Sequence, residues 1–130
     1  MRVEVLEILD PAQRIVRFRC ESGTASGRWM GSALVEAGRY DVELEVPEEV
    51  VEWTAEASGT ASLAEAAGTE RAALITGQVV GYDDGDDPVV EIRVGPDILL
   101  VEIPERRQEL LREGFISFRA PEIQLYPYDL

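Results

Sequence analysis

The sequence predicts a mainly β fold, namely a small antiparallel barrel with one or two short helices. Apolar and polar residues alternate in several short segments, most clearly in residues 39–46, and a period of two is typical of half-buried strands. Turn-forming Pro, Gly and Asp residues separate these segments at short intervals, as in antiparallel sheets. The chain of 130 residues is long enough to bury a core of its own, so we expect a single domain over residues 1–130.

These signals predict eight strands along the chain. They cover residues 2–9, 14–20, 39–46, 75–82, 89–94, 97–103, 115–120 and 122–126. The turn at residues 10–13 joins the first two strands as a hairpin, and the aspartate-rich turn at residues 83–88 joins the fourth to the fifth.

Two helices are expected, each after a Pro-Glu pair. Residues 104–113 begin with proline and an acid and stop before Gly114, which is the usual punctuation of a helix. Residues 47–58 begin in the same way and end at Gly59, although Val50 and Val51 also suit a strand.

The two halves of the chain, about residues 1–59 and 74–130, resemble each other at an offset of 57 residues. A strand that ends in an apolar residue, followed by Pro-Glu and a helix-like segment, occurs in both halves. Residues 16–19 also parallel residues 90–93, with a gap. We expect either an internal duplication, with the Ala/Gly/Thr-rich segment 60–73 as its linker, or a chance recurrence of this junction.

The second half has the order strand, strand, strand, helix, strand, strand. In element order alone this resembles the five-stranded OB-type barrel. The resemblance implies an OB-like barrel, or two duplicated half-barrels packed together, and a plain β-sandwich is the alternative.

The composition excludes several classes of function. The chain has no histidine, which removes the commonest general base and every catalytic triad that needs imidazole. Its one cysteine, Cys20, excludes an intrachain disulfide and a multi-cysteine zinc site, and its place on an apolar strand face predicts a buried structural thiol. A net charge of −14 should repel nucleic acid and anionic membranes and attract basic proteins. We therefore expect no enzyme and no cofactor.

The location expected from the sequence is cytoplasmic. No apolar run is long enough to cross a bilayer. The first residues alternate charged and apolar side chains, as a strand does and a secretion signal does not. We expect no membrane partner.

Three groups of residues are candidates for binding. The turn at residues 83–87 concentrates four carboxylates, those of Asp83, Asp84, Asp86 and Asp87. These carboxylates would either bind a divalent cation weakly or belong to a turn that is simply solvated. Glu48, Glu49 and Glu52 would line one side of the first helix next to Trp53, as a docking face or a solvated one. Trp29 and Met30 end a glycine-rich stretch and would either cap the barrel or anchor a protein partner.

Three functions are consistent with these features. The first is a non-catalytic acidic protein that docks a basic protein partner, as immunity-type or regulatory proteins do. The second is an OB-like module for single-stranded nucleic acid or oligosaccharide, in which Arg17 and Arg19 would line a groove unless they pair with acids across strands. The third is a carboxylate-based metal-dependent enzyme. The C-terminal residues 123–130 would pack on the barrel or offer an edge strand to a second copy, giving a dimer.

Overall fold

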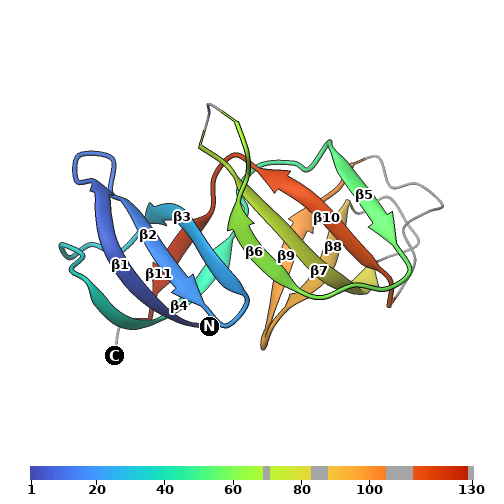
Figure 1. Cartoon of the computed structure of the whole chain (residues 1–130), viewed down its shortest axis with the longest axis horizontal. Coiled ribbons are helices and arrows are strands. Elements are labelled where there is room, and N and C mark those ends of the chain that lie inside the picture. Colours follow the sequence, from blue (N-terminus) through green and yellow to red (C-terminus); the bar gives the residue numbers. More distant parts are fainter. Residues whose placement is uncertain (69–70, 83–87, 105–112, 129–130) are drawn as a thin grey trace.

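The computed structural model describes residues 1–68, 71–82, 88–104 and 113–128, and these residues form eleven strands and no helix (Figure 1). The strands are β1 (Arg2–Asp10), β2 (Ile15–Cys20), β3 (Gly23–Trp29), β4 (Gly38–Glu45), β5 (Trp53–Glu56), β6 (Ser62–Glu65), β7 (Ala73–Tyr82), β8 (Val89–Val94), β9 (Asp97–Glu102), β10 (Phe115–Ala120) and β11 (Gln124–Pro127). The predicted mainly β, barrel-like fold is confirmed.

Five of these strands close into a ring, on the left of Figure 1, which we call the closed barrel. β1 pairs with β2 and β4, β2 pairs with β3, and β11 lies between β3 and β4. The β3–β11 pairing is parallel and the others are antiparallel. The backbone amides of Arg28 and Met30 donate to the carbonyls of Ile123 and Leu125 at 2.8 and 2.9 Å. The C-terminal strand β11 is therefore hydrogen-bonded on both sides and completes the closed barrel.

The remaining strands form a second lobe, on the right of Figure 1. β10, β7, β8 and β9 pair antiparallel in that order, and β5 pairs antiparallel with β10. The Val50 amide, just before β5, donates to the Glu102 carbonyl at the end of β9 at 2.8 Å. β6 pairs with both β7 and β3, so it joins the second lobe to the closed barrel.

The two lobes follow one pairing scheme. The closed barrel has the order β11-β4-β1-β2-β3, and the second lobe has the order β5-β10-β7-β8-β9. β11 belongs to the C-terminal half of the chain but completes the N-terminal barrel, whereas β5 belongs to the N-terminal half but pairs with β10. The two halves of the chain thus exchange their fifth strands.

The first three strands of this scheme, β1 to β3 and β7 to β9, repeat at an offset of 74 residues. The leading strands β1 and β7 each carry a register shift at the equivalent place, after Val5 and after Val79. The parallel between residues 16–19 and 90–93 belongs to the same scheme, because these residues lie in β2 and β8. The offset of 57 residues instead superposes β4 on β9, and these strands hold different places in the scheme.

Two loop hydrogen bonds repeat at the same offset. The Trp29 amide donates to the Arg14 carbonyl at 2.8 Å, and the Ile103 amide donates to the Pro88 carbonyl at 2.8 Å. Each bond joins the end of the third strand of its lobe, β3 or β9, to the start of the second strand, β2 or β8. The repeat therefore extends from strand pairing to the backbone at the strand ends.

The helix predicted over residues 47–58 is wrong. Residues 53–56 form strand β5, and Val50 is buried. Trp53 points inward while Thr54 is exposed, which is the period of a strand. Burial of this segment against β9 and β10 outweighs a Pro-Glu start that only permits a helix. The other predicted helix, residues 104–113, falls almost wholly on residues 105–112, which lie outside the described part of the chain.

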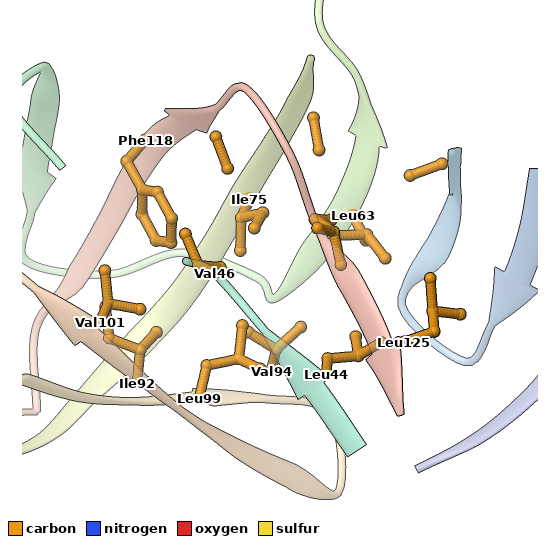
Figure 2. Packing of buried hydrophobic residues seen from close by; sticks show 14 of the residues in the cluster. Leu44, Val46, Leu63, Ile75, Ile92, Val94, Leu99, Val101, Phe118 and Leu125 are labelled. Atoms are coloured by element: carbon orange, nitrogen blue, oxygen red, sulfur yellow. The ribbon is translucent and has the colours of Figure 1, made fainter. Parts of the chain in front are cut away.

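One core of buried apolar side chains runs through both lobes (Figure 2). Leu125 and Leu44 belong to the closed barrel, Val101 and Phe118 belong to the second lobe, and all four are in the same cluster. The lobes are therefore joined by packing as well as by the exchanged strands.

Candidate functional site

A run of exposed glutamates begins on β4 and continues into the segment after it. Alternation along β4 turns its apolar side chains into the core and its acids outward. We call the following side chains the acidic tract: Glu43, Glu45, Glu48, Glu49 and Glu52. None of them forms a salt bridge with an arginine among the residues that the structure describes. Val51, within the tract, is 78% exposed, so an apolar side chain accompanies the acids.

The arginines on the outer face of β2 are paired with acids of β1. Arg17 contacts Glu7, and Arg19 contacts Glu4, in both cases across the β1–β2 pairing. These arginines therefore serve cross-strand ion pairs and do not form a groove of free cations.

Asp41, the first outward acid of β4, differs from the tract because it is paired. The Arg2 guanidinium donates to its two carboxylate oxygens at 3.1 and 3.3 Å. These hydrogen bonds, and the adjacent positive charge, hold the pKa of the Asp41 carboxyl below its ordinary value. The same contacts raise the pKa of Arg2.

Both tryptophans are buried, so neither presents an exposed ring to a partner. Trp29 is 4% exposed and packs edge-on against Tyr40, with ring centroids 4.8 Å apart. Trp53 is 8% exposed at an inward position of β5. Both lie in strands that the sequence analysis did not predict, so their inward direction was not visible. Of the expected anchors on the glycine-rich stretch, Met30 is exposed.

The expected cation site at Asp83, Asp84, Asp86 and Asp87 lies outside the described residues. Within residues 1–68, 71–82, 88–104 and 113–128, no three acidic, cysteine or histidine side chains come together in a way that would hold a metal ion. The same residues contain no helix with the length and apolar character needed to cross a bilayer.

A polar pocket of about 180 Å³ lies against β3 of the closed barrel. Its polar wall comes from four separate parts of the chain. Gln13 lies in the β1–β2 turn, Ser26 and Arg28 lie on β3, Glu122 precedes β11, and Arg71 precedes β7. The pocket therefore forms only when β11 has closed the barrel and β7 is in place.

A chain of hydrogen bonds fixes Arg28 at this pocket. Its Nε donates to Glu122 Oε1 at 2.7 Å, and its Nη1 donates to the Gln13 carbonyl at 2.9 Å. Glu122 in turn accepts from Gln124 Nε2 at 2.9 Å, and Gln124 accepts from the Tyr126 hydroxyl at 3.0 Å. The guanidinium is held in one orientation by these contacts.

Gly27 allows this arrangement. A Cβ at this position would lie 2.9 Å from the Ile123 carbonyl oxygen and 2.5 Å from Leu125 Cδ1. The absence of a side chain lets the segment before β11 approach β3 closely, and this approach places Glu122 beside Arg28.

Sequence reasoning found part of these features. It named Glu48, Glu49 and Glu52 but placed them on a helix, and it did not group Glu43 and Glu45 with them. The alternation in residues 39–46 carried the missing signal, because it turns both glutamates outward next to the others. It did not find the pocket, since only the closure by β11 brings distant residues together there.

Comparisons of this chain with models of protein families, with curated proteins and with solved structures find no match.

Proposed function

We propose that this chain is a non-catalytic binding protein whose acidic tract docks a basic protein partner. The proposal depends on the difference between the paired charges of β2 and the charges of the acidic tract, which are unpaired in the described part of the chain. The arginines of β2 are paired with acids of the same chain, whereas the five glutamates of the tract have no such partner among the described residues. Surplus negative charge of this kind attracts a positively charged surface and speeds its association.

The tract supplies an apolar contact as well as charge. Val51 lies among the glutamates and is exposed, and an apolar side chain that a partner covers slows dissociation. An inhibitor or regulator of a basic protein, of the immunity type, would work in this way because it needs only to cover its target. The single half-buried thiol of Cys20 suits a reducing compartment, so we place this activity in the cytoplasm.

The experiment compares partner capture by the chain and by two charge variants. In the tract variant the five glutamates become glutamine, which removes charge while keeping shape: E43Q, E45Q, E48Q, E49Q and E52Q. In the matched control five other exposed glutamates are changed in the same way: E21Q, E36Q, E56Q, E91Q and E113Q. Proteins captured from the native cell are identified by mass spectrometry, and association with the purified partner is then measured at low and high salt.

We expect a partner with a net positive charge. Its association rate should fall by about tenfold or more in the tract variant and fall at high salt with the unchanged chain. The control variant should keep most of the rate, because its charges lie elsewhere. Equal losses in both variants, or a partner that binds independently of salt, would contradict the proposal.

A second candidate function follows from the closed barrel. OB-type barrels have five strands and bind oligonucleotides or oligosaccharides on their second and third strands, here β2 and β3. We propose this OB-like role as the alternative, favoured by the five-stranded ring. Fluorescence anisotropy with a labelled single-stranded oligonucleotide at low salt tests it, and glycan-array binding tests the oligosaccharide form. Absence of binding in both assays would leave the acidic tract as the basis of function.

A further inference from the structure

The pocket against β3 has the features of a ligand site. Its volume of about 180 Å³ corresponds to roughly six water molecules, which suits a small molecule and not a polymer. Three of its polar side chains are charged, namely Arg28, Arg71 and Glu122. The local charge is therefore positive by one, on a chain whose net charge is −14.

Ser26 adds a hydroxyl to the wall of the pocket. It is 6% exposed and is the one buried polar side chain among the described residues. Its hydroxyl forms no hydrogen bond with any described residue, and the residue lines the pocket. The hydroxyl oxygen is not among the described side-chain atoms that are closed off from solvent without a partner, so it is accessible from the pocket. A ligand in the pocket would find this hydroxyl as a hydrogen-bonding group.

The two arginines define the chemistry of the ligand. Arg28 is fixed through its Nε and Nη1, which leaves Nη2 without a bond to the described residues. Arg71 lines the same pocket, is exposed, and forms no salt bridge within the described part of the chain. Guanidinium groups match the paired oxygens of carboxylates and phosphates.

We infer that this pocket binds a small oxyanion, a carboxylate or a phosphate, between Arg28 and Arg71, with Ser26 donating its hydroxyl hydrogen to the same ligand. Glu122 has a different role, because it holds Arg28 in position and does not itself attract an anion. The inference does not rest on the proposed docking function, since the pocket and the acidic tract share no residue.

The experiment is a titration of ¹⁵N-labelled protein, followed through its amide resonances. Inorganic phosphate and acetate are added in separate arms, and sodium chloride at matched ionic strength forms the third arm. We expect saturable shifts for the amides of Ser26, Gly27 and Arg28 with phosphate or acetate, and none with chloride. The arm that saturates at the lower concentration identifies the ligand class as phosphate or carboxylate.

Two variants test the assignment of residues. Ser26→Ala and Arg71→Gln should each raise the dissociation constant about tenfold or more, because each removes a hydrogen bond to a charged group. The matched controls Ser32→Ala and Arg93→Gln, at exposed positions outside the pocket, should leave it unchanged. Amide spectra of the free variants confirm that each is folded.

Three results would overturn the inference. These are shifts that follow chloride as closely as phosphate and acetate, saturable shifts that fall outside the pocket, and equal dissociation constants for the pocket variants and their controls. Loss of oxyanion binding in Arg71→Gln with unchanged partner capture would separate this site from the acidic tract.

Discussion

Replacing Leu125 by alanine tests whether the exchanged strands make the two lobes unfold together. Leu125 lies on β11 and is fully buried in the closed barrel, although it belongs to the C-terminal half of the chain. Truncation of a buried leucine to alanine costs about 2–5 kcal/mol, which includes the cavity left behind. An unfolding entropy of about 2.1 cal/mol/K per residue gives roughly 0.27 kcal/mol/K for 130 residues. The expected fall in Tm is therefore about 7–18 °C.

The two buried tryptophans allow each lobe to be followed separately. Trp29 lies on β3 of the closed barrel, and Trp53 lies on β5 of the second lobe. A Trp53→Phe background reports the barrel through the remaining indole, and a Trp29→Phe background reports the second lobe. Thermal and urea unfolding are recorded by fluorescence in both backgrounds, with and without Leu125→Ala.

We expect Leu125→Ala to lower both transitions by the same amount. The core is continuous and each lobe contains a strand of the other half, so neither lobe should melt alone. Leu34→Ala is the matched control, because that side chain is 94% exposed and its loss should change stability by less than about 0.5 kcal/mol. A shift confined to the Trp29 transition would refute the reasoning, since it would mean that the lobes unfold independently.

Three further predictions concern single sites. Gly27→Ala should destabilise the chain by about 1–3 kcal/mol in urea unfolding, because its Cβ would meet the Ile123 carbonyl oxygen at 2.9 Å. Gly59→Ala is the comparison and should cost less, because that residue is exposed and its Cβ would meet the Phe115 ring at the longer distance of 3.2 Å. Because the pKa of Asp41 is lowered in the folded state, its contribution to stability is present above its unfolded pKa and is lost as the pH falls through the folded value. Carboxyl NMR should therefore show Asp41 titrating below an ordinary aspartate, and Arg2→Gln should raise its pKa; an unchanged value in that variant would disprove the pairing. Acrylamide should quench the fluorescence of both tryptophans weakly in the native state, and strong quenching of either would contradict its burial.

The sequence predicted the strands that alternate and missed those that do not. Residues 39–46 alternate clearly, and β4 covers Gly38–Glu45. β3 has the sequence Gly-Thr-Ala-Ser-Gly-Arg-Trp, whose small and polar residues suggest a loop, and it becomes a strand because β2 and β11 lie on either side of it. Pairing with neighbours, and not local preference, determines such a segment.

The candidate sites also differ in whether a local sequence pattern could predict them. The outward glutamates could be inferred from alternation, since exposure on a strand is a local property. The pocket could not, because Gln13, Arg71 and Glu122 meet only through the placement of β11 and β7. The burial of both tryptophans was also hidden, since it depends on strands β3 and β5 that local patterns did not indicate.

The exchange of fifth strands affects how the chain is made. During synthesis β1 to β4 leave the ribosome long before β11, so the nascent barrel has a gap between β3 and β4 until residues 124–127 emerge. Two open strand edges border that gap in the interval, and such edges pair readily with other chains. Closure of the barrel is consequently a late step of folding. A cut in the connection between β5 and β6 would give two fragments that each lack a strand carried by the other, so that they can restore the native pairing only as a complementing pair.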